Sequence, residues 1–198
     1  MQNQNKKPFR IVLTGGPGGG KTTAADLIRR EIGEKIVVVP EAATMLFRGG
    51  FPRCKNSLAR RAAQTAIYHV QINLEEVHRA LYSGRVLLCD RGTVDSAIYW
   101  PEDDGDFFEM MHSSLENELK RYDAVIFFES AAVGNISIEG GNPVRTESLE
   151  EARELDKKLQ EVWSQHKNYY FIPHQQSFIK KLELAIKVIK GLIHTNGY

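Results

Sequence analysis

One stretch near the start of the chain has the residue types and spacing that bind phosphate. Residues 15–22 read Gly-Gly-Pro-Gly-Gly-Gly-Lys-Thr and fit the pattern Gly-x-x-x-x-Gly-Lys-[Ser/Thr] at every fixed position. Glycines let backbone N–H groups wrap around a phosphate, and a helix that starts there adds a favourable dipole. The sequence therefore predicts a nucleoside triphosphate site, in which Lys21 contacts the terminal phosphates and Thr22 offers a hydroxyl to Mg²⁺. The residues that we assign to nucleotide binding are Gly15, Gly16, Pro17, Gly18, Gly19, Gly20, Lys21, Thr22 and Thr23.

A second group of candidate residues follows a short apolar run at residues 86–89. Asp90 is suited to holding Mg²⁺ directly or through water, and with Thr22 it makes the candidate metal site; the alternative is that Asp90 only caps a strand end. Arg91 has the planar fork that binds phosphate or carboxylate, although a surface ion pair explains the same residue. Asp95 either lines the same cleft or caps a helix.

Two further candidates lie elsewhere in the chain. Glu41 follows the apolar run at residues 36–39 and can accept a proton from an acceptor hydroxyl or position it, unless it is simply solvated. Residues 130–148 are rich in Gly, Ser and Asn, and a long segment of this kind is typical of a functional lid. Arg145 within it is expected to close over the transferred phosphate and neutralise its charge. The candidate catalytic residues are Lys21, Glu41, Asp90, Arg91 and Arg145.

These candidates require a scaffold in which apolar strands alternate with helices. Short apolar runs predict five buried strands, at residues 9–14, 36–39, 86–89, 124–128 and 169–172. Apolar residues at helical spacing predict five helices, at residues 21–32, 58–82, 106–121, 148–162 and 178–192. On the longest helix the residues expected to share a face are Ala63, Ile67, Val70, Leu74, Val77 and Leu81. Such alternation predicts a parallel sheet covered on both faces, with ligands at the carboxyl ends of the strands.

The composition of the 198-residue chain is that of one folded domain, residues 1–198, with a polar tail at residues 1–7. Hydrophobic residues make up 42% and charged residues 26%, which excludes disorder as the main state. Lys and Arg (26) nearly balance Asp and Glu (25), so we expect no nucleic-acid binding and assign the lysines of the last helix to a solvated face. No apolar run approaches the roughly 20 residues that span a bilayer. Two cysteines without metal-ligand spacing fit a cytoplasmic protein.

Four motifs together resemble a known family. They are the phosphate loop, Pro-Glu at residues 40–41, Asp-Arg-Gly at residues 90–92 and Asn-Pro-Val-Arg-Thr-Glu at residues 142–147. The chain resembles the AAA_28 family of P-loop NTPase domains over residues 9–192. That family is close to the NadR ribosylnicotinamide kinase domain and similar to the nucleotide-binding domain of the photoreceptor translocation-defect protein. The resemblance implies a three-layer α/β sandwich like that of nucleoside and nucleotide kinases, with a parallel five-stranded sheet in the order 2-3-1-4-5, and it implies ATP or GTP with Mg²⁺.

Two functions are consistent with these features. The first is a kinase-like phosphotransferase that moves the γ-phosphate of ATP to a small nucleoside-like acceptor. The second is a regulatory module or switch that binds ATP or GTP and hydrolyses it slowly. A Ras-like GTPase is disfavoured because residues 129–132 read Glu-Ser-Ala-Ala where such proteins carry the guanine-reading Asn-Lys-x-Asp. The expected partners are therefore a nucleoside triphosphate and a small-molecule acceptor.

Overall fold

The computed structural model describes residues 8–53, 55–134 and 148–198. Its centre is a five-stranded sheet made of β1 (Arg10–Thr14), β2 (Ile36–Val39), β3 (Val86–Asp90), β4 (Ala124–Phe128) and β5 (Tyr169–Ile172). All neighbouring strands run parallel, and their order is β2-β3-β1-β4-β5. The predicted parallel sheet is confirmed, as is the strand order that the family resemblance implied.

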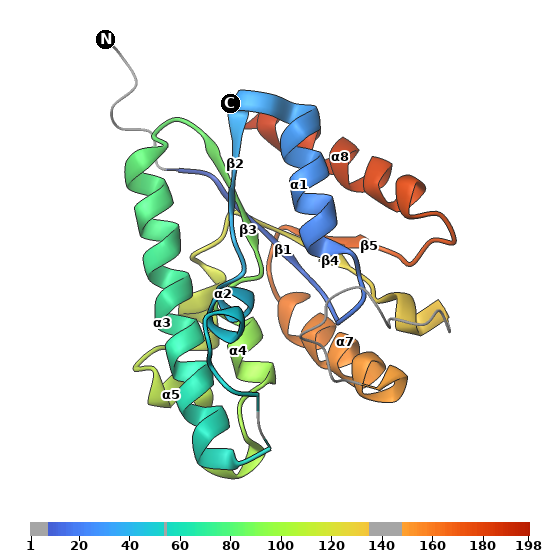
Figure 1. Ribbon diagram of the computed structural model, residues 1–198. Helices are drawn as coiled ribbons and strands as arrows, with labels where there is room; N and C mark the ends of the chain where they lie inside the picture. The colour runs from blue at the N-terminus through green and yellow to red at the C-terminus, as the bar shows by residue number, and fades with distance from the viewer. Residues whose placement is uncertain (1–7, 54, 135–147) are drawn as a thin grey trace.

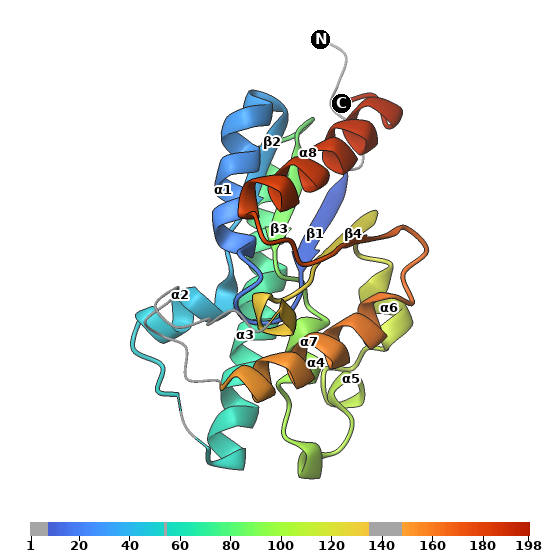
Figure 2. The ribbon, with the colours of Figure 1, turned by 90° about the vertical axis from the view of Figure 1, so that its right-hand side faces the viewer.

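Helices cover both faces of the sheet, as Figures 1 and 2 show. Ile11 and Leu13 of β1 point into a core that is closed by α1 (Lys21–Ile32) and α8 (Phe178–Thr195). Val12 points to the opposite face, where it joins a second core. Among the helices that contribute residues to that second core are α3 (Ser57–Leu81), α6 (Leu115–Leu119) and α7 (Leu149–Trp163). The molecule is thus the three-layer α/β sandwich that the sequence predicts.

Short helices fill the connections between these elements. The α-helical ones are α2 (Ala42–Arg48), α4 (Asp95–Ile98) and α5 (Phe107–Met110), and the 3₁₀ turns are η1 (Gly33–Lys35), η2 (Glu102–Asp104) and η3 (Ala131–Gly134). Neither α2 nor α4 was predicted from the sequence. Both follow the carboxyl ends of strands, so they lie at the edge of the sheet where the candidate residues gather.

The helix predicted over residues 106–121 is wrong as a single element. The structure has α5 and α6 there, separated by a turn in which His112 has a φ of 52°. Ser114 then caps α6 by accepting a hydrogen bond from the Asn117 N–H at 3.2 Å. Serine favours such caps over helix interiors because its hydroxyl competes for backbone groups, which explains the break.

The predicted apolar face of the long helix holds for only part of α3. Ala63 and Ile67 are buried, but the Val77 and Leu81 side chains are 51% and 69% exposed. The second half of α3 instead buries Gln71 and Glu75. The Glu75 carboxylate accepts hydrogen bonds from the side chains of Tyr122 and Arg121, and these polar partners turn that face of the helix toward the sheet.

Candidate functional site

The phosphate loop connects β1 with α1 at the carboxyl edge of the sheet. Gly15 has a φ of 133°, and a Cβ atom there would lie 2.1 Å from the Phe128 carbonyl oxygen, so the position requires glycine. Helix α1 begins at Lys21 with Gly20 as its N-cap and without a side-chain cap. Its first N–H groups therefore remain suited to an anion, as the sequence predicts for residues 15–23. Thr23 lies exposed in this first turn.

The Lys21 side chain lies against the phosphate loop. Its Nζ donates to the carbonyl oxygens of Gly15 and Gly16 at 2.7 and 2.8 Å. The residue is only 4% exposed, yet it lines the cavity described below. The contact between Lys21 and the terminal phosphates of a nucleotide stays a prediction.

Asp90 and Thr22, the two predicted metal ligands, lie side by side because β3 pairs with β1. Thr22 Oγ1 donates to Asp90 Oδ2 at 2.7 Å. Asp90 Oδ1 is buried and has no hydrogen-bond partner among the described residues. A buried, unpaired carboxylate oxygen beside a hydroxyl fits a hard cation such as Mg²⁺, which commonly takes one or two protein ligands plus substrate phosphates. The part of the chain that the structure describes holds no cluster of three or more His, Cys, Asp or Glu side chains that could bind a metal.

The carboxyl groups of Asp90 and Glu41 have opposite pKa shifts. Burial and repulsion by the Glu41 carboxylate raise the pKa of Asp90 to about 6. Burial also opposes the charge on Glu41, but Arg91, the Thr44 hydroxyl and Lys21 outweigh it, so the pKa of Glu41 is lowered. Glu41 is therefore firmly ionised at neutral pH, whereas Asp90 gains most from a nearby cation.

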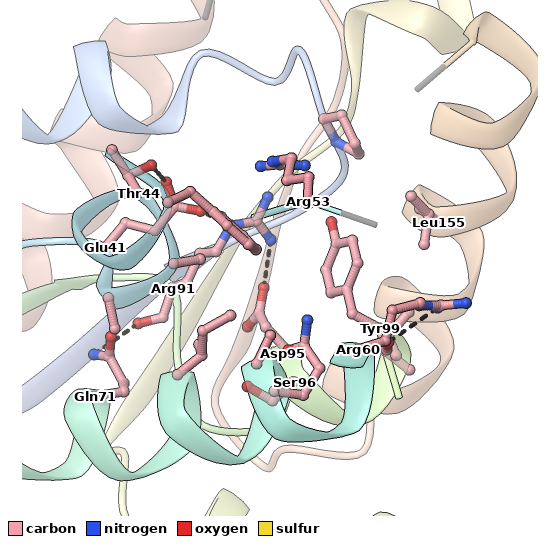
Figure 3. Close-up of a pocket in the computed structure, with 18 of the residues that line it drawn as sticks. Glu41, Thr44, Arg53, Arg60, Gln71, Arg91, Asp95, Ser96, Tyr99 and Leu155 are labelled. Carbon is pink, nitrogen blue, oxygen red and sulfur yellow. Dashed lines mark hydrogen bonds and ion pairs between the residues drawn. The ribbon is translucent and has the colours of Figure 1, made fainter. Parts of the chain in front are cut away.

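Arg91 joins two carboxylates at the inner end of the cavity, as Figure 3 shows. Arg91 Nε donates to Glu41 Oε1 at 2.6 Å, and Arg91 Nη1 donates to Asp95 Oδ1 at 2.7 Å. The Arg91 side chain is 13% exposed, so this is not the surface ion pair considered in the sequence analysis. The predicted residues Glu41 and Arg91 are thus brought together on one wall.

The backbone at Asp-Arg-Gly turns sharply. Arg91 has a φ of 70°, a conformation that costs a non-glycine residue roughly 1 kcal/mol. The turn is held by hydrogen bonds from the Arg91 N–H to the Leu13 carbonyl at 3.0 Å and from Gln71 Nε2 to the Arg91 carbonyl at 3.4 Å. A Cβ atom on Gly92 would lie 2.8 Å from the Trp163 ring, so the third residue must be glycine. The turn directs Asp90 toward the phosphate loop and Arg91 into the cavity.

Asp95, for which the sequence left two interpretations open, lines the cavity as the first residue of α4. Its carboxylate accepts hydrogen bonds from Thr14 Oγ1 at 2.9 Å, the Gly92 N–H at 3.2 Å and Trp163 Nε1 at 3.1 Å, in addition to the bond from Arg91. These donors come from β1, the turn after β3 and α7. Asp95 therefore fixes the position of Arg91 relative to the sheet.

Asp156 of α7 is a further residue of the site that was not predicted from the sequence. Its Oδ1 accepts hydrogen bonds from the backbone N–H groups of Gly16 at 2.7 Å and Ser130 at 2.9 Å, so α7 is tied directly to the phosphate loop. One signal was present in the sequence. Asp156 shares a buried helix face with Ala152, Leu159 and Trp163, and a charged residue at such a position usually has a fixed partner.

Lys181 of α8 also contacts the phosphate loop. Its Nζ donates to the carbonyl oxygens of Gly19 and Glu129, and it lies 4.9 Å from the centre of the Phe128 ring. Lys181 is 3% exposed, so assigning it to the solvated face of the last helix is wrong. Lys181 is buried because it lies four residues before Ala185, so both residues are on the side of α8 that faces the sheet.

A cavity of about 750 Å³ extends from the phosphate loop between α2, α3, α4 and α7. Its inner end is lined by Lys21, Thr22, Glu41, Arg91 and Asp95. Apolar lining residues are Ala42, Phe47, Ala63, Ile67, Ile98, Tyr99 and Leu155. Further polar and charged lining residues are Arg53, Lys55, Arg60, Gln64, Ser96, Glu151, Glu154 and Lys158. The volume is in the range of sites that enclose small molecules.

The neighbouring aromatic residues Tyr99 and Trp100 have different environments. Tyr99 lines the cavity, and the Arg91 guanidinium lies 5.7 Å from the centre of its ring. Trp100 is buried in a small aromatic cluster with Tyr68 and Phe107. Only the first of the two aromatic residues is therefore available to a ligand.

Arg145 and residues 135–147 of the predicted lid lie outside the described residues. The described ends of that segment are both anchored. Ser130 donates its hydroxyl to the Pro17 carbonyl of the phosphate loop, and Ser148 forms the predicted capping box at the start of α7. Across the described ranges, no helix is both long and apolar enough to cross a membrane.

Comparisons with known proteins agree with this geometry. The model of the AAA_28 family, described as an AAA domain, matches residues 10–178. A solved structure of deoxyadenosine kinase from M. mycoides with bound dATP is similar to this chain with a TM-score of 0.66 and 17% identity, over 92% of this chain and 99% of that one. Likeness at this identity shows a shared fold. No curated protein sequence matches the chain.

Proposed function

Because the chain belongs to the AAA_28 family and has the fold of a P-loop kinase, we propose that it moves the γ-phosphate of ATP to a hydroxyl group of a small nucleoside-like acceptor. The observation that carries this proposal is the continuity of the cavity. One cavity is lined by Lys21 and Thr22 of the phosphate loop and also by Glu41 and Arg91, with apolar space beyond them. A module that only binds nucleotide requires no such space next to the phosphates.

Thr22 and Asp90 are the residues suited to hold Mg²⁺ beside the phosphate loop, through the Thr22 hydroxyl and the unpaired Asp90 Oδ1. Bound there, Mg²⁺ supplies positive charge that stabilises the phosphates during transfer. Lys21 and the first N–H groups of α1 contribute the remaining positive potential around the phosphates.

Glu41 is the group to which we assign the activation of the acceptor. In the reaction the acceptor oxygen forms a bond to the γ-phosphorus, the bond from that phosphorus to ADP breaks, and the hydroxyl proton passes to the Glu41 carboxylate. The lowered pKa of Glu41 keeps it ionised, so it orients the hydroxyl throughout and takes the proton late, as a largely dissociative transfer allows. Arg91 holds Glu41 in place through the 2.6 Å ion pair and adds positive charge next to the transferred group.

The direct test is a coupled assay of ADP release against nucleosides, nucleotides and pyridine ribosides, with ATP and Mg²⁺ alone as the control. We expect ADP release that depends on an acceptor and is matched by an equal amount of phosphorylated product, detected by mass spectrometry. ADP release that no acceptor changes, accompanied by free phosphate, would identify a nucleotide-binding module with slow hydrolysis.

A substitution separates transfer from hydrolysis. Glu41→Gln removes the proton acceptor but leaves the predicted Mg²⁺ ligands intact, so we expect transfer to fall by about a hundredfold or more while background ATP hydrolysis is retained. Glu154→Gln is the matched control, because Glu154 lines the same cavity on α7 but does not contact Arg91. An equal loss in both variants, or loss of hydrolysis in Glu41→Gln, contradicts the role of Glu41.

A further inference from the structure

The cavity extends well beyond the groups that act on the phosphate. Helix α3 lines it from Gln71, which contacts the Arg91 carbonyl, to Arg60 near the start of the helix. At a rise of 1.5 Å per residue this lining runs about 16 Å along the helix axis. An acceptor whose hydroxyl reaches Glu41 therefore has room for a further chemical group that lies toward Arg60.

Three positively charged side chains of the outer lining come from the side of α2 and α3, which we call the α2–α3 wall. Arg53 and Lys55 come from the connection between α2 and α3, and Arg60 comes from the first turns of α3. The Arg53 guanidinium lies 4.3 Å from the centre of the Phe47 ring, so an aromatic face supports it. Arg60 Nη2 donates to the Tyr99 carbonyl at 3.1 Å, as Figure 3 shows. That bond uses one of the five N–H groups of Arg60.

The opposite wall, on α7, carries charges of both signs. Glu151 contributes its carboxylate to the capping box of α7 by accepting from the Ser148 N–H at 2.7 Å. Lys158 pairs with Glu102 at 3.1 Å, and Glu154 completes the wall. Among the described residues the excess of positive charge thus belongs to the α2–α3 wall, although the Glu151 carboxylate interacts with Lys55.

We propose that the acceptor carries a negatively charged group, a carboxylate or a phosphate, in addition to the hydroxyl that receives the phosphoryl group, and that Arg53, Lys55 and Arg60 bind this group. The inference rests on the proposed function, because it specifies the acceptor of the same site. Arginine is the side chain best matched to such groups, since its planar N–H fork binds carboxylate and phosphate oxygens in pairs. The apolar lining, including Ile67 and Tyr99, packs against the uncharged middle of the acceptor.

The experiment measures binding, so it does not depend on turnover. The full chain is saturated with Mg²⁺ and a non-hydrolysable ATP analogue, and calorimetry then compares compounds that differ mainly in one negatively charged group. The carboxylate pairs are nicotinic acid riboside with nicotinamide riboside and orotidine with uridine, and the phosphate pair is adenosine 3′-monophosphate with adenosine. We expect the charged member of at least one pair to bind about tenfold more tightly or better, and the pair identifies which anion is recognised. The preference should weaken as salt rises.

Substitutions then locate the anion site. In the double variant Arg53→Ala/Arg60→Ala the charged and neutral members should bind almost equally, while the affinity for the ATP analogue stays unchanged. Arg30→Ala is the control, because Arg30 is an exposed arginine on α1 that pairs with Asp26 away from the cavity. It should retain the full preference.

Three results overturn the inference. Equal binding of the members of every pair by the unmodified chain overturns it alone and leaves the proposed transfer reaction standing. If the double variant loses affinity for the ATP analogue as well as for both members of a pair, the arginines bind the nucleotide and not the acceptor. If the protein binds neither member of any pair, both the inference and the assignment of a nucleoside-like acceptor are wrong. If the charged member binds through the arginines but is not phosphorylated, the anion site is supported and the proposed reaction fails.

Discussion

The two ends of the cavity use charged residues in opposite ways. At the phosphate-loop end Asp90, Asp95 and Asp156 are each buried and each hydrogen-bonded to another part of the fold. At the outer end Arg53 and Arg60 are exposed and belong to the connection after α2 and the first turns of α3. The charged residues of the inner end are buried and held by hydrogen bonds, whereas those of the outer end are exposed on the surface.

This difference suggests how such a fold separates chemistry from recognition. Buried charges need fixed partners, so the inner end changes only at a large cost in stability. Exposed arginines on a connecting segment can be replaced at little cost. We therefore expect the inner end to perform the same transfer for any acceptor, and the outer end to determine which acceptor is used.

The largest expected effect is on stability, at the inner end. Asp95→Ala leaves the Thr14 hydroxyl, the Gly92 N–H and the Trp163 N–H without their acceptor and leaves Arg91 with one carboxylate partner, so we expect the free energy of unfolding to fall by about 3–5 kcal/mol. Chemical denaturation measures the loss. Arg60→Ala at the outer end should leave the midpoint of chemical denaturation unchanged. Equal losses in the two variants would remove the distinction between the ends.

The second effect is on activity at the same end. Asp90→Asn keeps an acceptor for the Thr22 hydroxyl but removes the negative charge suited to Mg²⁺, so transfer and background hydrolysis should both fall by about a hundredfold or more. Glu41→Gln should affect transfer alone. Kinetics as a function of Mg²⁺ concentration tests the assignment, because an Asp90→Asn enzyme with normal Mg²⁺ dependence and normal rates excludes Asp90 as the metal ligand.

The inner end could be located from the sequence because its main parts are local. The phosphate loop at residues 15–22 is a contiguous motif, and Asp90 and Glu41 each follow an apolar run that is a strand in the structure. A parallel sheet places the carboxyl ends of its strands at one edge, so the proximity of these residues followed from the fold class. The strand order itself came from the family resemblance.

The residues that hold the inner end in position through long-range hydrogen bonds could not be predicted in the same way. Asp156 and Gly16 are separated by 140 positions, and the bond between them depends on how α7 packs on the sheet. No spacing rule within α7 identifies its partner. Lys181 was misplaced for the same reason, because a lysine among exposed neighbours is solvated unless a distant carbonyl group pairs with it. Long-range pairs of polar groups are a property of tertiary packing, and composition and periodicity describe only local order.

The smallest expected effect tests whether burial of the inner charges is costly, and it uses Lys181. Burial lowers the pKa of Lys181 from its ordinary value of 10.5 to about 8. Between these two pH values the unfolded chain binds more protons at this position than the folded chain, so the free energy of unfolding should rise as pH increases through that window. The whole shift corresponds to about 3 kcal/mol. Because two carbonyl oxygens and the Phe128 ring favour the charged form, we expect a rise on the order of 1–2 kcal/mol.

Lys181→Met isolates this contribution, since it removes the titrating group and keeps a side chain of similar length. Denaturation of both proteins at several pH values from about 7 to 9.5 gives the difference in the free energy of unfolding, and this difference should grow in favour of the unmodified protein as pH increases. Lys180→Met is the control for the substitution itself, because Lys180 is the neighbouring lysine in the sequence and is exposed. If the Lys181→Met curve runs parallel to that of the unmodified protein, the lysine carries no penalty for its charge. The difference in stability between charged residues at the inner end and at the outer end would then be supported by the carboxylates alone.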